Sequence, residues 1–414
     1  MSTQPHVAVI GGGIAGLTLA LELHAADIPC RVYEAVPEVS AVGVGINILP
    51  HATRHLTRLG LQDALAAVAV TTEKSLYFNR FGQHIHTEAV GRAAGYEWPQ
   101  FSIHRGDLQK VLADAVRDRL GPDALLTGHR CTQVEDDGTG VTLSFTHPDG
   151  STSTARADAV VACDGIHSAV RKQLHPDEGR PVYSGYNMWR GVAPWPAVLG
   201  GASMLRAGWL DTGKLVLYPI RDRVDDQGRQ LVNWVVEIAT PHHAERDWNR
   251  TGRIEDFIDH FADWHFDWLD VPALLRATDD ILEYPMVDQE PLPWWGRGRV
   301  TLLGDAAHPM VPRGSNGAGQ AILDAACLAG TLVQHPDVTD AFAAYEAERR
   351  PATAAVVRAN RTNPPDAVLR EVYERTGDQP FERIEDVISA TELEGIIGAY
   401  KRVAGYSPGE LQQH

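Results

Sequence analysis

Hydrophobic and polar positions near the start of the chain form short apolar runs that are separated by a glycine-rich turn. Residues 6–10 are apolar and rich in β-branched side chains, which is typical of a buried parallel strand. After the turn, apolar residues recur through residues 17–23, as in a helix. Residues 29–33 form a second apolar run that ends at Glu34. The pattern therefore predicts a strand, a turn, a helix and a second strand.

The turn has the spacing G-x-G-x-x-G, and its residues are Gly11, Gly13, Ile14, Ala15 and Gly16. The first glycine allows a tight turn, the second lets a pyrophosphate approach the backbone, and the third lets helix and strand pack closely. The N-terminus of the helix offers free N–H groups to phosphates, and Glu34 can accept hydrogen bonds from an adenosine ribose. We expect a dinucleotide site rather than a plain structural turn. The motif leaves FAD and NAD open, whereas Glu34 disfavours the 2′-phosphate of NADP.

Composition narrows the classes of function. The chain has 414 residues, of which 44% are hydrophobic and 22% charged, as expected of a globular protein with two or three domains. Its net charge of −17 disfavours binding to nucleic acid. No run approaches the roughly 18 apolar residues that a membrane span needs. The scattered Cys30, Cys131, Cys163 and Cys327 form no paired motif, which excludes a zinc ribbon and favours a cytoplasmic location.

Two further apolar runs lead into turns that contain glycine and aspartate. Residues 158–162 precede Cys163-Asp164-Gly165, and residues 299–303 precede Gly304-Asp305. A loop with three glycines, residues 312–319, then leads into a helix near Gln320. These segments resemble the Asp-Gly and Gly-Asp motifs of the single-component FAD-dependent aromatic hydroxylases. The resemblance covers most of the chain and implies the p-hydroxybenzoate hydroxylase fold. That fold has a Rossmann-like α/β FAD-binding domain, an inserted, mainly antiparallel β-sheet substrate domain and a C-terminal helical segment.

The resemblance also implies roles for residues. Asp305 is expected to bind the ribityl chain of non-covalently held FAD, and Asp164 to lie on the flavin side of the second motif. The helix near Gln320 would direct its positive dipole end at the flavin ring, which stabilises reduced flavin. Further cofactor contacts are expected at Gly45, Arg105, Gln109, Gly314, Asn316, Gly317 and Ala318. We expect no metal site and a structural role for His308, whereas Arg171 is open between a cofactor contact and a solvated helix residue.

The middle of the chain is predicted to form strands over residues 188–192, 203–206, 214–220 and 231–238, and it holds seven of the ten tryptophans. Such a sheet suits a flat apolar substrate. Candidates for the pocket lining are Trp189, Tyr218, Trp234 and Pro312, although most single rings in such a sheet are core. We expect an FAD-binding domain of residues 1–75, 101–178 and 291–362, a substrate-binding domain of residues 76–100 and 179–290, and a helical tail of residues 363–414. A long helix over residues 341–361 is expected to break at Pro351.

The segments 43–48, 102–105, 188–191 and 231–234 resemble the bacterial phenazine-type monooxygenases most closely, whereas the segment 312–316 departs from that group. The implied activity is a monooxygenase that uses NADH or NADPH and O2 to hydroxylate an aromatic or heteroaromatic small molecule through a flavin C4a-hydroperoxide. The catalytic residues are unknown. The alternatives are a flavin-dependent oxidase, dehydrogenase or halogenase-like enzyme on the same fold, or a non-catalytic flavin-binding sensor. The helical tail could cover the flavin domain or form the face of a homodimer.

Overall fold

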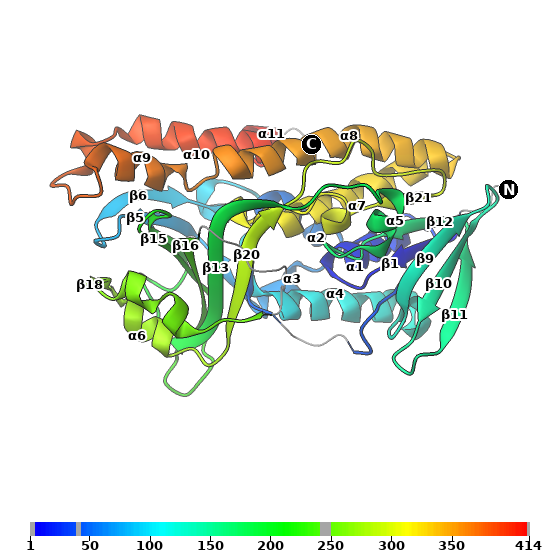
Figure 1. The fold of residues 1–414 in the computed structure, drawn as a ribbon, viewed down its shortest axis with the longest axis horizontal. Helices are drawn as coiled ribbons and strands as arrows, with labels where there is room; N and C mark the ends of the chain where they lie inside the picture. Colours follow the sequence, from blue (N-terminus) through cyan, green and yellow to red (C-terminus); the bar gives the residue numbers. More distant parts are fainter. Residues whose placement is uncertain (1–4, 39–42, 241–249, 412–414) are drawn as a thin grey trace.

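The computed structural model describes residues 5–38, 43–240 and 250–411. A parallel sheet and a larger, mainly antiparallel sheet lie side by side (Figure 1). A layer of helices from the C-terminal part of the chain runs along both (Figure 1). This arrangement confirms the predicted combination of a Rossmann-like α/β sheet, an antiparallel sheet and a helical C-terminal segment.

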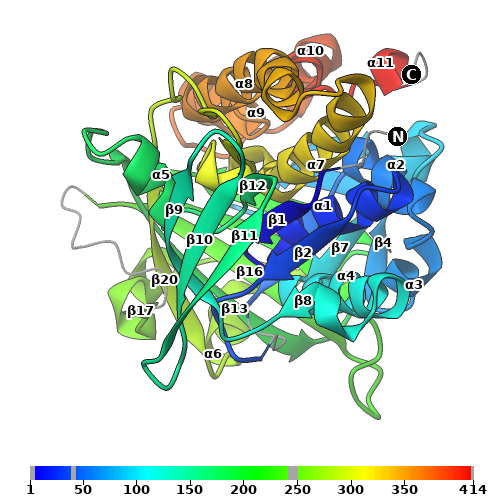
Figure 2. The same ribbon diagram turned by 90° about the vertical axis from the view of Figure 1, so that its right-hand side faces the viewer.

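The parallel sheet is built from buried strands that come from distant parts of the sequence. Its strand order is β21 (Val300–Leu302), β12 (Ala159–Ala162), β1 (Val7–Ile10), β2 (Cys30–Tyr33) and β8 (Leu125–Leu126). Helix α1 (Ile14–Ala25) packs against both α4 (Arg105–Leu120) and α7 (Gly317–Gln334). A small antiparallel sheet contributes Val134, Leu143 and Phe145 to the same core, and its strands are β9 (Arg130–Asp136), β10 (Val141–Thr146) and β11 (Thr152–Ala157) (Figure 2). The first turns of α1 and α7 therefore lie at the carboxyl ends of β1 and β21.

The larger sheet, called the large sheet below, contains all four strands predicted for the middle of the chain. Its order is β17 (Arg250–Thr251), β20 (Ile281–Asp288), β13 (Val182–Trp195), β16 (Gln230–Ala239), β15 (Gly213–Arg221), β14 (Ser203–Trp209), β5 (Lys74–Phe78) and β6 (His84–Ala89). The pairs are antiparallel except for β14 with β5. Because side chains alternate along a strand, the sheet has two distinct faces.

A third, short sheet connects the parallel sheet with the large sheet. It consists of β3 (Gly45–Ile48), β7 (Gln100–His104) and β4 (Ala69–Thr72). Strand β7 runs directly into α4, so Arg105 is the first residue of that helix. The shorter helices are α2 (Pro50–Arg58), α3 (Gln62–Ala66), α5 (Ala169–Leu174) and α6 (Val271–Arg276).

The C-terminal helices form the layer seen at the top of Figure 1. They are α8 (Val338–Thr362), α9 (Ala367–Thr376), α10 (Ala390–Ala404) and α11 (Pro408–Leu411). The predicted break at Pro351 was wrong, because α8 continues through this residue. Thr353, Ala354, Val356 and Val357 are buried on the second half of the helix, and this packing holds both halves in line despite the missing N–H group. No helix in the described ranges is long and apolar enough to cross a membrane.

Candidate functional site

Two glycines of the first turn, Gly11 and Gly16, are required because other backbone atoms lie too close for a side chain. Gly11 has a φ of 103°, and a Cβ atom there would lie 2.4 Å from the carbonyl oxygen of Cys163. A Cβ atom at Gly16 would lie 2.0 Å from the carbonyl oxygen of Gly11. In contrast, a Cβ atom at Gly13 would meet no protein atom within 4 Å. The turn is therefore packed against the second motif and accessible at Gly13, immediately before α1, where a phosphate group can approach.

Two polar side chains from other segments form hydrogen bonds with the backbone of this turn. Glu34, at the end of β2, accepts hydrogen bonds from the backbone N–H groups of Gly12 (2.5 Å) and Val36 (2.8 Å). The Nε2 atom of Gln109, on α4, donates to the carbonyl oxygen of Gly12 (2.7 Å). The structure thus brings both predicted contacts to the glycine turn.

The second motif lies directly against the first one. Asp164 follows β12, and its carboxylate accepts a hydrogen bond from the N–H group of Ala169 (2.9 Å). Burial raises the pKa of Asp164. Its Oδ1 atom is buried without a hydrogen-bond partner among the described residues. Such an atom calls for a donor from a ligand or water.

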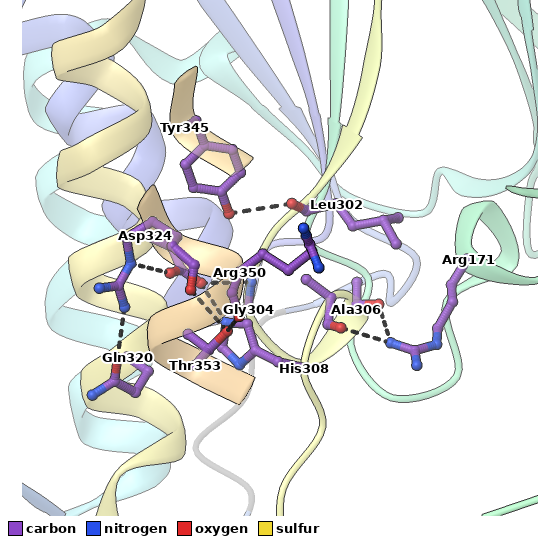
Figure 3. A network of polar contacts seen from close by, with 12 residues as sticks. Arg171, Leu302, Gly304, Ala306, His308, Gln320, Asp324, Tyr345, Arg350 and Thr353 are labelled. Carbon is purple, nitrogen blue, oxygen red and sulfur yellow. Dashed lines mark hydrogen bonds and ion pairs between the residues drawn. The ribbon is translucent and has the colours of Figure 1, made fainter. Parts of the chain in front are cut away.

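Arg171 is not the solvated helix residue that was one of its two expected roles. It is buried, and its Nη1 atom donates to the carbonyl oxygens of Ala306 (2.8 Å) and Ala307 (2.9 Å). Its Nη2 atom pairs with Glu178 at 2.5 Å. Arg171 therefore ties the second motif to the third one from the side opposite to His308 (Figure 3). The sequence carried no signal for this connection.

Asp305 lies where the third motif meets the first turn of α7. Its carboxylate is accessible to solvent, and its Oδ1 atom would be 3.9 Å from a Cβ atom at Gly317. The surrounding protein raises the pKa of Asp305 by desolvation, and the charges of His308 and Arg105 act in the opposite direction. The preceding Gly304 has a φ of 64°, and a Cβ atom there would approach the Cβ atom of Ala15 to 3.1 Å. The three motifs thus converge at one place.

A buried polar network supports the third motif from behind. The Nε2 atom of His308 lies 2.5 Å from Asp324 on α7, and the two side chains point at each other (Figure 3). Arg349, on α8, donates to the same carboxylate (2.7 Å) and to Gln320 (2.6 Å). Burial opposes the charged form of Asp324, but the charges of His308 and Arg349 outweigh it and lower its pKa. This network supports the structural interpretation of His308.

The C-terminal helix α10 covers the loop that precedes α7. Gly314 has a φ of 80°, and a Cβ atom there would lie 2.0 Å from the hydroxyl oxygen of Tyr400. This hydroxyl donates to Asn360 on α8 (2.6 Å) and accepts a hydrogen bond from Asn316 (3.0 Å). Because Asn316 bonds to Tyr400 and does not cap the helix, the first N–H groups of α7 have no side-chain acceptor and can donate to a ligand. The sequence analysis did not identify Tyr400. Of the two roles expected for the helical tail, the structure shows the one in which the tail covers the rest of the chain, here at the loop before α7.

Comparison with known proteins identifies the family. The chain matches the family described as an FAD binding domain over residues 4–190 and 281–360. It is 46% identical over 366 residues to phenazine 1,6-dicarboxylic acid hydroxylase PhzS of Lysobacter antibioticus, and the match covers 87% of this chain and 90% of that relative. The chain belongs to the FAD-dependent aromatic hydroxylases. It is also 32% identical to 6-hydroxynicotinate 3-monooxygenase of Pseudomonas fluorescens, over 88% of this chain and 92% of that protein.

Solved structures show the same fold. A variant of HpxO from Klebsiella pneumoniae in complex with FAD has a TM-score of 0.77 at 26% identity and covers 98% of this chain and 100% of its own. A substrate complex of salicylate hydroxylase has a TM-score of 0.72 at 24% identity and covers 98% of this chain and 99% of its own. In this hydroxylase family, NADH or NADPH supplies electrons and O2 supplies the oxygen atom.

The residues of the hydroxylase fit FAD. The open position at Gly13, the unpartnered oxygen of Asp164 and the accessible carboxylate of Asp305 all lie near the point where the motifs meet. The first turns of α1 and α7 have no side-chain cap. Two uncapped helix N-termini beside an open glycine, a buried unpartnered carboxylate oxygen and an exposed carboxylate are suited to a ligand with a pyrophosphate and a hydroxylated chain.

Three side chains from the large sheet hold the peptide groups of Gly45, another predicted cofactor contact. Its N–H group donates to Asn233 (2.7 Å), and its carbonyl oxygen accepts from Tyr218 (2.8 Å) and Arg190 (2.5 Å). A Cβ atom at Gly45 would lie 2.7 Å from Ile220 and from Asn233, so only glycine fits. The Nε atom of Arg190 and the Nδ2 atom of Asn233 are buried without partners in the described ranges. The hydroxylase therefore keeps free donors where the large sheet meets this loop.

The candidates for the pocket lining lie on opposite faces of the large sheet. Tyr218 packs with Val311, the residue before Pro312, and its hydroxyl reaches Gly45. Trp189 and Trp234 belong to the core on the other face, and both rings contact Phe257. The proposal of Trp189 and Trp234 as lining residues is therefore corrected to core packing. The reason is strand alternation, because Trp234 points away from the face that its neighbour Asn233 presents to Gly45.

Proposed function

We propose that this hydroxylase acts on a planar aromatic or heteroaromatic compound that lies between FAD and one face of the large sheet. That face, called the apolar face below, is formed by Met188, Met204, Val216, Tyr218, Ile220, Val235 and Met286, and Val311 from the loop before α7 packs in the same cluster. The observation that carries the proposal is the position of Tyr218, which packs in this cluster while its hydroxyl bonds to Gly45. Apolar side chains with flexible methionines suit a flat ring.

The residues of the three motifs would hold FAD in defined roles. The turn at Gly13 and the N-terminus of α1 would bind the pyrophosphate, Glu34 the ribose and Asp305 the ribityl chain. The N-terminus of α7, with Gly317 and Ala318, would stabilise negative charge on the reduced ring. Arg105, Gln109 and Asp164 are proposed as supporting contacts. FAD, when bound, supplies the oxygen-transfer chemistry.

The protein also has to keep water from the reacting atoms. Helix α10 covers the loop at Gly314 through Tyr400, and the large sheet holds Gly45 through Tyr218, Arg190 and Asn233. A ring enclosed by these two loops would react away from bulk water, which favours oxygen transfer over loss of H2O2.

The test is a screen of planar aromatic and heteroaromatic compounds against the FAD-loaded enzyme. A substrate should stimulate NADH or NADPH consumption and yield a product that is heavier by one oxygen atom. The same screen run without flavin controls for direct oxidation of the compounds. If no aromatic compound stimulates turnover or gains oxygen, the proposed function is wrong.

The domain boundaries given above are part of this proposal. We also propose a cytoplasmic enzyme, since Cys30, Cys131, Cys163 and Cys327 are free thiols. Formation of a homodimer stays a prediction.

A further inference from the structure

The side chain of His51, on α2, is buried against the first turn of α7. It is 1% exposed, and its Nε2 atom lies 3.1 Å from the position that a Cβ atom would take at Gly319. Its ring stacks on the ring of Tyr406, with 5.2 Å between the centroids and 17° between the planes. Neither ring nitrogen has a hydrogen-bond partner among the described residues. A buried imidazole without partners costs free energy that an apolar side chain would not, which indicates a polar role at this position.

His51 is held in its neutral form. Burial lowers its pKa to about 3, and basic side chains on α2 and α8 act in the same direction. The side chain of Asn316 acts against them, which places it beside the ring. A neutral imidazole has one N–H donor and one acceptor nitrogen. His51 can therefore donate one hydrogen bond without bringing a charge to the start of α7.

Asn316 occupies the N-cap position of α7, where its backbone carbonyl accepts a hydrogen bond from the N–H group of Gln320 (2.8 Å). Asparagine is preferred at this position because its side-chain oxygen can accept from a backbone N–H group of the first turn. That bond is absent in α7. The Nδ2 atom donates instead to Gly314 (3.1 Å) and Tyr400 (3.0 Å), and the Oδ1 atom is buried without a partner in the described ranges.

The positions of His51 and Asn316 account for the missing cap. Residues 316 and 319 are three apart and lie on the same side of the helix, so the ring at Gly319 is next to the amide of Asn316. A donor that lacks an acceptor thus lies beside an acceptor that lacks a donor. A hydrogen bond from the imidazole to the amide oxygen would satisfy both groups and hold that oxygen away from the first N–H groups of α7.

We propose that His51 is a positioning residue for the flavin: it keeps the side chain of Asn316 turned away from α7, so that the first N–H groups of this helix stay free for the flavin ring. The inference rests on the proposed function, which places the ring at this helix N-terminus, and it adds a residue that controls how strongly reduced flavin is stabilised. Without His51, Asn316 would cap the helix and compete with the ring for its donors. Because hydrogen bonds to a charged group are the stronger ones, reduced flavin would lose more than oxidised flavin.

The test measures FAD affinity and the flavin midpoint potential in His51→Leu, which keeps a similar volume and removes the donor. Affinity should fall by about threefold to tenfold for oxidised FAD and by about tenfold to a hundredfold for reduced FAD, so the midpoint potential becomes more negative. The FAD-free protein should lose little stability towards urea, because Asn316 then caps α7. His51→Gln, whose amide offers a donor near the position of Nε2, should restore most of the wild-type potential.

The same substitution is also made in an Asn316→Ala background, where position 316 cannot cap the helix. There, His51→Leu should change the ratio of the affinities for reduced and oxidised FAD by less than about twofold. His55→Leu, one turn further along α2, is the control and should keep the wild-type potential. Equal shifts in both backgrounds would overturn the inference, as would a loss of stability with an unchanged potential. A His51→Leu variant that does not fold would show a structural role and overturn it too.

These measurements need no substrate and do not involve the apolar face. Hydroxylation of aromatic compounds by a His51→Leu variant with a wild-type potential would refute only the role of His51. Conversely, the expected shifts in an enzyme that hydroxylates no aromatic compound would refute only the proposed function.

Discussion

The hydroxyl group of Tyr400 fills the space beside Gly314, where any side chain would have to lie. A Cβ atom at Gly314 would be 2.0 Å from that oxygen. The same hydroxyl bonds to Asn360 and Asn316, so that one tyrosine connects α10, α8 and the start of α7. A C-terminal helix therefore determines the shape of the loop that is proposed to lie against the flavin ring.

Gly314→Ala should disturb this loop. The added methyl group collides with Tyr400 and costs about 1–3 kcal/mol of stability. We expect a lower FAD content and less product per NADH or NADPH consumed. Gly95→Ala is the matched control, because Gly95 has a φ of 85° but no protein atom within 4 Å of the added methyl group. If both variants behave alike, backbone strain alone explains the effect and the contact with Tyr400 is unimportant.

Tyr400→Phe removes only the hydroxyl group. It leaves the buried oxygen of Asn360 without its donor, so the free energy of unfolding should fall by about 1–3 kcal/mol. The loop should also become less ordered, and more of the reduced flavin should yield H2O2. Urea denaturation and the ratio of product to NADH or NADPH consumed measure the two effects. Tyr373→Phe, on the neighbouring helix α9, is the comparison; wild-type coupling in Tyr400→Phe would contradict the positioning role.

Asp305→Ala should weaken the hold on the ribityl chain. Loss of a hydrogen bond to a charged group corresponds to about a tenfold to hundredfold lower FAD affinity. A displaced ring also admits water, so the enzyme should be reduced more slowly and coupled less tightly. FAD titration, the rate of flavin reduction and product yield are measured beside Asp177→Ala, which changes an exposed carboxylate. Wild-type values for all three in Asp305→Ala would show that FAD is placed elsewhere.

The stability of the protein should depend on Asp324 at acid pH. Its pKa is lowered in the folded state, below the unfolded value of about 3.9. The unfolded chain then binds the proton more readily, so the stabilisation is complete near neutral pH and is lost as the pH falls below about 4. Asp324→Asn leaves Arg349 buried without its anion and should cost about 3–5 kcal/mol at neutral pH. Urea denaturation between pH 3 and pH 7 should show a shallower acid dependence in this variant; an unchanged slope would count against the ion pair.

Much of the fold and of the cofactor site could be predicted because the signals are local. Gly16 contacts Gly11 and Val9 within one strand–turn–helix unit. The buried runs at β1, β12 and β21 are recognisable from their apolar residues alone. Asp305 and Asp164 follow such runs directly, which places them at the carboxyl edge of a parallel sheet.

The tertiary structure decided what local patterns cannot encode. Alternation along β16 predicts that the side chains of Asn233 and Trp234 point to opposite faces of the sheet. It does not predict which of the two side chains points toward Gly45. Arg171 and Tyr400 gain their roles from contacts with Ala306 and Gly314, more than eighty residues away in the chain. Lys214 pairs with both Glu237 and Asp366, and Arg206 pairs with Asp366, so charged residues from four different segments are buried together. Such contacts depend on how distant segments pack, and the periodicity of a sequence reports only on the segment in which it occurs.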